Sequence, residues 1–470
     1  MGIEYLGLSS INGPLVILEG VQDAFFDEIV EFTVDGKTKK IGRIIELYED
    51  KAVIQVFEGT ENMSLDNTRT KLTGHPMEVS LAPDMLGRTF NGIGKPIDGL
   101  GPLITDVKRD VNGLPLNPVR RKYPRNYIRT GISAIDGLTT LIRGQKLPIF
   151  SGNGLPHDQL AAQIVKQASL GDGSDEPFAV VFGAMGVKHD VADFFQKTFE
   201  ESGVADHVCM FLNLANDPVV ERLITPKVAL TAAEYLAFEK HMHILVILTD
   251  MTSFAEAMRE VSSSKGEIPS RKGYPGYLYS ELATIYERAG IVEGIDGSVT
   301  QIPILTMPND DITHPVPDLT GYITEGQIVL DRSLDQNGIY PPISVLSSLS
   351  RLMKDGIGEG YTRADHQAVA NQLFSCYAKV GDARALASVI GEDELSPLDK
   401  KYLVFGREFE HRFVGQDPHD NRNIITTLDI GWQLLGLLPK EELDRIDTKL
   451  LAQYYKATKL DENGELVDAE

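Results

Sequence analysis

Polar and apolar residues alternate along much of the first 75 residues of the chain. The alternation runs through residues 28–34, breaks at Asp35-Gly36, and resumes in 42–47 and 52–58. A period of two turns successive side chains toward opposite faces of a strand, and Asp-Gly between two such runs is a strong hairpin signal. Short strands at this spacing predict a small β-barrel or sandwich.

The pattern changes near residue 130, where short apolar runs begin to alternate with longer helical stretches. The segment before it, 87–101, is rich in glycine and predicts a loop. Apolar strands that alternate with helices predict a parallel sheet covered on both faces, which binds ligands at the carboxyl ends of its strands. The expected strands are 178–182, 208–212, 244–248 and 301–306, and the expected helices are 190–201, a stretch capped at Asp217-Pro218, and 277–288.

Beyond about residue 352 the chain predicts helices, and the acidic stretch from Lys459 is expected to fray. The sequence therefore predicts a multidomain α+β and α/β fold, with an N-terminal β-barrel, a central α/β domain and a C-terminal helical bundle. The expected C-terminal helices are 364–377, 398–412, 424–438 and 441–455.

Composition excludes several classes of protein but does not identify a function. The 470 residues suffice for two to four domains, and no apolar run reaches the length of a membrane span. Cys209 and Cys376 are the only cysteines and lie in no metal-type spacing, so we expect a reducing cytosol and no metal site. The N-terminus lacks the pattern of a secretory signal. The net charge of −23 argues against bulk nucleic-acid binding, which needs a basic surface.

The most informative segment is 148–160, PIFSGNGLPHDQL, which reads as strand, glycine-rich turn and helix. A phosphate loop of the form G-x-x-x-x-G-K-[ST] needs a late glycine, a lysine and a hydroxyl residue. Those three places hold Pro156, His157 and Asp158, while Gly152 and Gly154 keep the turn. The sequence thus predicts the scaffold of a nucleotide site without its chemistry.

Each of the three replacements weakens phosphate binding. Pro156 lacks the N–H that would face a phosphate oxygen, and His157 is shorter than lysine and mostly neutral at pH 7. Asp158 has the largest effect, because two like charges about 5 Å apart repel by roughly 3 kcal/mol at an effective dielectric of 20. We infer that its carboxylate fills the place of a phosphate at the helix N-terminus, the alternative being an ordinary polar turn.

Two further positions bear on hydrolysis. Asp250 ends an apolar strand, where an acid could orient magnesium, but it also precedes a helical stretch and is better explained as an N-cap. Val187 stands where active hydrolases of this layout often carry a carboxylate that polarises water. Asp190 lies nearby and is expected to cap a helix. This pattern predicts no water-activating acid in the chain.

The segment 341–351, PPISVLSSLSR, carries one arginine at the join between the α/β and helical regions. An arginine at a domain edge could reach a neighbour's nucleotide in trans, an effect worth about 10³–10⁵ in rate. The segment alone favours the alternative, in which Arg351 caps a helix or pairs with an acid.

Four segments together resemble one family over essentially the whole chain. They are LGRTFNGIGKPIDGLGPL, RTGISAIDGLTTLIRGQKLPIFSG, GEIPSRKGYPGYLYSELATIYERAG and PPISVLSSLSR. They are similar to the B subunits of V-type (A-type in prokaryotes) rotary ATPases or ATP synthases. One departure is Ser344, where family members usually carry an acid, amide or imidazole.

The resemblance implies a β-barrel over residues 1–75, a RecA-like α/β domain with a degenerate phosphate loop over 76–351, and a helical domain over 352–470. It implies an alternating ring of three A and three B subunits that touches central and peripheral stalk subunits. ATP or ADP with magnesium then lies at the interface with the A subunit, and this chain alone binds no cofactor and is not catalytic. The complex is expected on the cytoplasmic face of the cell membrane, coupling ATP synthesis or hydrolysis to proton or sodium transport, with no membrane insertion of this chain and no nucleic acid.

The resemblance also assigns roles to particular residues. Arg351 matches the arginine finger, and Ser348 and Ser350 would neighbour the nucleotide. The loop 266–276 would face the central stalk through four residues, Arg271, Lys272, Gly273 and Pro275, with Lys265 beside it. Three rival hypotheses stay open: an autonomous ATPase with a divergent loop, an RNA-directed hexameric motor, and a binding subunit whose Arg351 is only structural.

Overall fold

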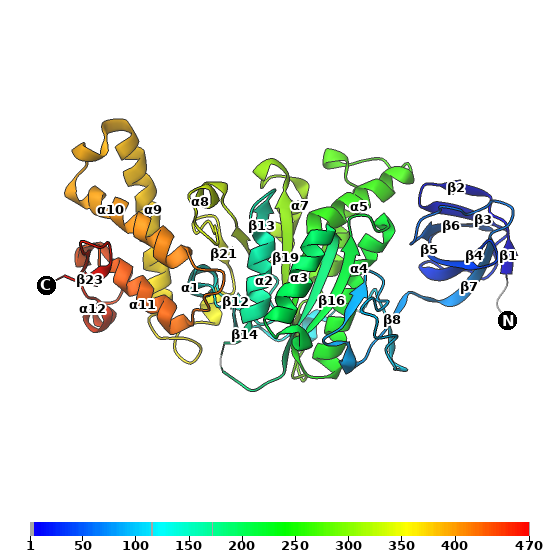
Figure 1. The fold of residues 1–470 in the computed structure, drawn as a ribbon, viewed down its shortest axis with the longest axis horizontal. Helices are drawn as coiled ribbons and strands as arrows, with labels where there is room; N and C mark the ends of the chain where they lie inside the picture. The colour runs from blue at the N-terminus through cyan, green and yellow to red at the C-terminus, as the bar shows by residue number, and fades with distance from the viewer. Residues whose placement is uncertain (1–3, 114–115, 172, 470) are drawn as a thin grey trace. The chain divides into compact units, whose positions relative to one another are not determined.

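The structure is a computed structural model that describes residues 4–113, 116–171 and 173–469. Its chain forms two compact units. Unit 1 comprises Met1–Arg121, Ala179–Thr306 and Thr313–Ile323, and unit 2 comprises Lys122–Phe178, Met307–Ile312 and Thr324–Glu470. Figure 1 labels the elements of both units along the chain.

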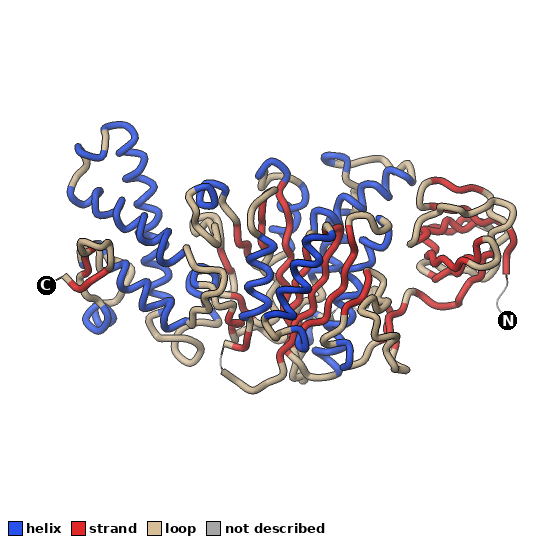
Figure 2. Tube along the Cα trace, in the orientation of Figure 1, coloured by secondary structure: helices blue, strands red, loops and turns tan. Residues whose placement is uncertain are grey.

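Unit 1 begins with a curled seven-stranded antiparallel sheet, in the strand order β1-β7-β4-β5-β6-β3-β2 (Figure 2). The β4–β5 hairpin turns at Asp35-Gly36, where both residues have positive φ, as the Asp-Gly signal predicted. Val30, Phe32 and Ile44 are fully buried inside the sheet. The strands are β1 (Glu4–Leu6), β2 (Ser10–Asn12), β3 (Leu15–Glu19), β4 (Glu28–Val34), β5 (Thr38–Tyr48), β6 (Lys51–Val56) and β7 (Arg69–Pro76).

The rest of unit 1 is an α/β layer with the strand order β19-β17-β15-β16-β9, in which β16 pairs in parallel with both β15 and β9. Helices α3 and α4 pack on β16. The strands are β8 (Glu78–Ser80), β9 (Thr89–Asn91), β10 (Lys108–Asp110), β15 (Phe178–Val187), β16 (Val208–Leu214), β17 (His243–Thr249), β18 (Gly290–Ile291) and β19 (Ser298–Met307). The helices are α3 (His189–Glu201), α4 (Val219–Glu234), α5 (Met251–Ser264), α6 (Leu278–Tyr286) and α7 (Pro315–Ile323).

Two local predictions in this layer are wrong. The glycine-rich segment 87–101 contains β9, which pairs with β16, and at this pairing Phe90 stacks on Phe211 at 5.2 Å between ring centroids. Asp217 does not cap α4, because its carboxylate accepts instead from the backbone N–H of Leu214, on the strand side of the turn.

Unit 2 holds β13 (Ile149–Gly152), which pairs in parallel with β20 (Gly326–Val329), while β21 (Leu349–Ser350) pairs antiparallel with β20. A small sheet of β11 (Tyr127–Arg129), β12 (Leu141–Ile142) and β14 (Ser169–Leu170) lies in the same unit. Its short helices are α1 (Ser133–Leu138), α2 (His157–Gln167) and α8 (Arg332–Gln336).

The C-terminal part of unit 2 is helical, as Figure 2 shows. It comprises α9 (His366–Ile390), α10 (Pro397–Glu408), α11 (Ile424–Leu435) and α12 (Thr448–Tyr454), followed by the hairpin β22 (Thr458–Leu460) and β23 (Leu466–Asp468). The π-helical segments η4 (Tyr235–Glu239) and η9 (Phe409–Val414) extend α4 and α10. The 3₁₀ segments are η1 (Pro83–Met85), η2 (Pro118–Arg120), η3 (Ala205–His207), η5 (Arg271–Gly273), η6 (Pro308–Asp310), η7 (Met353–Asp355), η8 (Glu392–Glu394) and η10 (Lys440–Glu442).

The prediction that the chain frays from Lys459 is wrong. The turn at Gly464 has positive φ, and Arg412 donates to the Gly464 carbonyl at 2.6 Å and pairs with Glu465 at 3.1 Å. The expected helix 441–455 is shorter than predicted, because Asp447 accepts from the Lys449 N–H and starts α12 at residue 448.

The barrel, the α/β layers and the helical C-terminal region confirm the predicted fold class. The division of the chain at residues 75 and 351 stays a prediction. Among the described residues, none of the helices combines the length and apolar character that crossing a bilayer requires.

Candidate functional site

The degenerate phosphate loop joins β13 to α2 within unit 2. Gly152 ends the strand, and Gly154 takes a positive φ of 81° in the turn. Pro156 is the N-cap of α2 and gives it no side-chain cap, so His157 and Asp158 form the first turn of the helix. The strand, turn and helix that the sequence indicated are therefore present, with an acid at the positive end of the helix.

Backbone N–H groups in this loop already have partners inside it. The Leu155 N–H donates to the Gly152 carbonyl at 3.1 Å, and the His157 N–H donates to the Leu155 carbonyl at 2.9 Å. A phosphate cradle needs such groups to point at the anion. Two backbone N–H groups of the loop are therefore hydrogen-bonded to carbonyl groups within the loop.

The side chain of His157 is also fixed locally. Its Nδ1 lies 2.9 Å from Ser151 Oγ, and its Nε2 lies 3.7 Å from Asp158 Oδ1. Ser151 stands at the first position of the G-x-x-x-x-G-K-[ST] pattern, which our sequence analysis did not use. Counting five residues back from Pro156 would have found it.

An ion pair that the sequence analysis missed also lies against the loop. Arg332, at the start of α8, donates to both carboxylate oxygens of Asp310 at 2.6 and 2.8 Å and to the Asn153 carbonyl at 3.0 Å. The Asp310 carboxylate lies so close to Gly152 that a Cβ at that position would collide with it. Arg332 holds the pKa of Asp310 below its usual range. The two residues lie far along the chain from the loop, and no motif links them to it.

Arg351 follows the edge strand β21, which is held against β20. Its backbone N–H donates to the Glu325 carbonyl at 2.9 Å, which continues this pairing by one residue. Its side chain is exposed, and its guanidinium has no hydrogen-bond or ion-pair partner in the ranges that the structure describes. The helix cap or acid that a purely structural arginine would need is therefore absent from these ranges.

Ser348 and Ser350 hold this segment in place. Ser348 is buried, and its hydroxyl accepts from the Val329 N–H at 2.9 Å and donates to the Ser344 carbonyl at 2.6 Å. Ser350 Oγ accepts from Gln145 Nε2 at 2.9 Å and donates to the Thr140 carbonyl at 2.9 Å. Both hydroxyls use their donor inside the chain and hold the segment that leads to Arg351, and their place beside a nucleotide stays a prediction.

Unit 1 carries the remaining candidates. Asp250 is the N-cap of α5: its Oδ1 accepts from the Thr252 N–H at 2.8 Å, and its Oδ2 accepts from the Thr306 hydroxyl. This confirms the N-cap interpretation. Val187 ends β15 as a buried apolar residue. Asp190 is not a cap, because α3 has Lys188 as its N-cap.

The loop 266–276 also lies in unit 1, and two of its basic residues are exposed. Arg271 pairs with Asp318 at 2.9 Å and donates to the Thr313 carbonyl at 2.6 Å, whereas Lys272 takes a positive φ of 54°. Gly273 is exposed, but Pro275 is buried beside the buried Tyr274. The contact of this loop with a central stalk stays a prediction.

Comparison with known proteins decides the family. One family model, the β-barrel domain of the ATP synthase alpha/beta family, matches residues 8–74, and the nucleotide-binding domain of that family matches 131–350. The C-terminal domain of V and A type ATP synthase matches 355–455. The V-type ATP synthase beta chain 2 of Clostridium tetani is 63% identical over 97% of this chain and 99% of its own length. This chain belongs to the V-type ATP synthase beta chain family.

Further comparisons agree with that assignment. The V-type ATP synthase beta chain of Halothermothrix orenii is 62% identical over 98% of this chain and 99% of its own length. A solved structure of an ATP synthase subunit, NeqB from Nanoarcheaum equitans, is 41% identical, with a TM-score of 0.73 over 91% of this chain and all of that chain. The resemblance inferred from the sequence is therefore confirmed.

In this member of the V-type ATP synthase beta chain family, the candidate residues fall into two groups. The loop residues from Gly152 to Asp158 and the arginine Arg351 belong to unit 2. Val187, Asp250 and the loop 266–276 belong to unit 1. Unit 2 thus contains both a phosphate-loop scaffold with an acid at its helix and an exposed arginine whose guanidinium has no partner among the residues that the structure describes.

Proposed function

We propose that this chain is a non-catalytic, regulatory subunit in the head of a rotary ATP synthase or ATPase. It alternates with three copies of a catalytic A subunit and contributes Arg351 to the nucleotide site on that neighbour. The head couples ATP synthesis or hydrolysis to proton or sodium transport. The name of the relatives, V-type ATP synthase beta chain, supports the setting of this proposal.

The observation that carries the proposal is the state of the Arg351 side chain. A guanidinium is always charged and offers five N–H donors in a planar fork that suits phosphate oxygens. In this chain it is exposed and unpartnered within the described residues, at the end of a strand fixed by Ser348 and Ser350. Because the backbone of Arg351 is fixed and its side chain is exposed, the guanidinium is suited to bind a ligand that another subunit supplies.

The loop residues support the same division of labour. Without a lysine, and with Asp158 at the helix N-terminus, this loop repels a triphosphate. ATP or ADP with magnesium therefore binds where the A subunit supplies its own loop, and Arg351 reaches that site across the interface. There it stabilises the charge that develops on the transferring phosphoryl group.

The remaining partners follow from the same assembly. Exposed Arg271 and Lys272 make the loop 266–276 basic on an acidic chain, and we propose that it contacts the central stalk. Other surfaces of the head meet peripheral stalk subunits. The complex lies at the cytoplasmic face of the cell membrane, and its membrane sector carries the ion.

Substitution of Arg351 in the reassembled head tests the proposal. We expect Arg351→Ala to lower the rate of ATP hydrolysis by about 10³–10⁵ while the ring still forms. Lys354→Ala is the control, because Lys354 is also exposed and lies three residues further along. Near-normal turnover of the Arg351→Ala head, in a ring of normal mass, would sink the proposal.

A further inference from the structure

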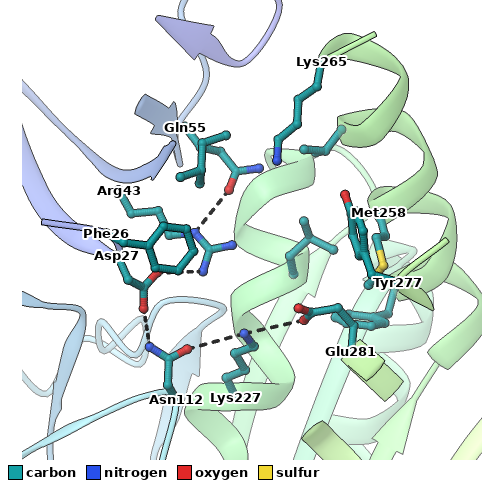
Figure 3. A pocket seen from close by; sticks show the side chains of 14 residues that line it. Phe26, Asp27, Arg43, Gln55, Asn112, Lys227, Met258, Lys265, Tyr277 and Glu281 are labelled. Carbon is teal, nitrogen blue, oxygen red and sulfur yellow. Dashed lines mark hydrogen bonds and ion pairs between the residues drawn. The ribbon is translucent and has the colours of Figure 1, made fainter. Parts of the chain in front are cut away.

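Unit 1 contains a cavity that has no part in the proposed nucleotide chemistry. It has a volume of about 420 Å³ and lies between strands of the N-terminal sheet and helices α4, α5 and α6. Figure 3 shows Arg43 and Gln55 reaching into it from the sheet and Lys227 and Glu281 from the helices. This volume falls in the range of small-molecule sites, roughly 300–1,000 Å³.

Lys227 is a buried cation with weak partners. Its side chain is 10% exposed, and its Nζ lies 3.4 Å from Asn112 Oδ1 and 3.7 Å from Glu281 Oε2. Good N–H···O bonds are about 2.7–3.2 Å long, so both contacts are long, and the described ranges offer no closer partner. A buried ammonium needs paired acceptors, since its desolvation is costly. Burial, and then the charge of Arg43, lower the pKa of Lys227.

Arg43 also lines the cavity, and some of its N–H donors are not bonded within the described residues. Its Nε donates to Gln55 Oε1 at 3.2 Å and its Nη1 donates to Asp27 Oδ1 at 3.3 Å. Within the described residues, its Nη2 has no acceptor. Figure 3 shows that Asp27 is shared with Asn112, so its carboxylate also serves a second donor. Of the three cations that line the cavity, Lys265 pairs with Glu267 at 3.5 Å, whereas Lys227 and Arg43 lack enough close acceptors among the described residues for their N–H groups.

Part of the lining of the cavity is apolar. Leu223 on α4 and Phe254, Met258 and Val261 on α5 line it and are buried, and the more exposed Phe26 lines it as well. A site that is lined by both cations and apolar side chains suits a ligand with an anionic end and an apolar body.

We propose that this cavity binds a small organic monoanion, a carboxylate carried on an apolar or aromatic body. The carboxylate lies between Lys227 and Arg43 and supplies the acceptors that they lack, and the body lies against Phe254 and Met258. Such a ligand bridges the N-terminal sheet and α4 within unit 1. The inference does not depend on the role of Arg351.

Binding of phenylacetate to the full-length chain tests the proposal, with the Met258 methyl group as the probe. In the ¹³C-methyl spectrum of the methionines we expect the Met258 signal to shift on addition of phenylacetate at concentrations up to about 10 mM, the affinity range of a weak ligand. Phenylacetamide, which has the same body without the charge, should bind at least tenfold more weakly. Inorganic phosphate, which has the charge without the body, should also bind at least tenfold more weakly.

Variants locate the effect at the two cations. We expect Lys227→Gln and Arg43→Gln each to weaken phenylacetate binding at least tenfold, and Lys51→Gln, at an exposed ion pair of the same sheet, to leave it unchanged. Equal binding of phenylacetamide, equal binding of phosphate, or no shift of Met258 would each overturn the proposal. If Lys227→Gln does not fold, Arg43→Gln and the comparison of the two phenyl ligands decide the question.

Discussion

Two segments of unit 2 bear on phosphate binding, the loop 152–158 and the segment that ends at Arg351, and their polar groups are paired differently. The loop between Gly152 and Asp158 keeps the strand, turn and helix of a phosphate site, but two of its N–H groups are bonded within it, and Arg332 pairs with Asp310 and contacts Asn153. In the segment that ends at Arg351, the hydroxyls of Ser348 and Ser350 are bonded within the chain, whereas the guanidinium of Arg351 has no partner among the described residues. The two segments therefore differ in whether their polar groups find partners inside this chain.

The difference lies in where the polar groups find partners. Around the loop, Asp310 pairs with Arg332, and the Nε2 atom of His157 lies 3.7 Å from Asp158 Oδ1. Arg351 has none within the described residues. A buried or paired group contributes to folding, whereas an open one is available for binding.

For the isolated chain, the largest expected effect comes from restoring the loop. Replacing Ser151→Gly, Pro156→Gly, His157→Lys and Asp158→Thr together should strengthen ATP·Mg²⁺ binding to the isolated chain by about 100-fold, since the repulsion from Asp158 alone is worth roughly 3 kcal/mol. Equilibrium dialysis with labelled ATP measures it. Gln159→Lys is the control, because it adds a lysine to the same helical turn outside the pattern. An unchanged affinity of the restored loop would show that the loop residues do not set nucleotide binding.

A smaller effect is expected from the anchor of the other segment. Ser350→Ala removes the donor to the Thr140 carbonyl and an acceptor for Gln145, so it should cost about 1–3 kcal/mol of stability. Arg351→Ala should change stability by less than about 0.5 kcal/mol, because the side chain is exposed and unpartnered. Urea unfolding followed by circular dichroism compares the two. A larger loss for Arg351→Ala than for Ser350→Ala would mean that the guanidinium has a structural partner after all.

The smallest effect concerns the ion pair over the loop. Arg332 and Asp310 are both more than a third exposed, with side-chain exposures of 38% and 41%, so solvent screens their attraction. Arg332→Ala should therefore change stability very little, and it should not create ATP binding, because Asp158 remains. Calorimetric titration of the variant with ATP·Mg²⁺ checks this. Appearance of tight binding would show that the ion pair, and not the loop residues, blocks the site.

The sequence predicted the fold class and the loop scaffold because both rest on local patterns. Period-two alternation marked the N-terminal sheet, and Asp35-Gly36 marked a hairpin that the structure contains. The local patterns did not predict β9, because it pairs with the distant strand that contains Phe211. They also did not predict the C-terminal hairpin, although Asn463-Gly464 was an available turn signal.

For the site, the sequence could name the residues of motifs but not their partners. Pro156, His157 and Asp158 were found from spacing alone. The contact of Arg332 with Asn153 joins residues far apart in the chain, and nothing in the local pattern predicts such a contact. The same limit explains the contacts of the Ser348 hydroxyl with Val329 and of the Ser350 hydroxyl with Thr140, which lie far from this segment along the chain.

A structure of the assembled head with a bound nucleotide would decide whether Arg351 acts on the neighbouring subunit. We expect the Arg351 guanidinium at about 3 Å from a phosphate oxygen of nucleotide held by the neighbouring A subunit. We also expect no nucleotide phosphate on residues 152–158 of this chain. Nucleotide phosphates seated on that loop, with Arg351 directed away from every bound nucleotide, would contradict the proposal.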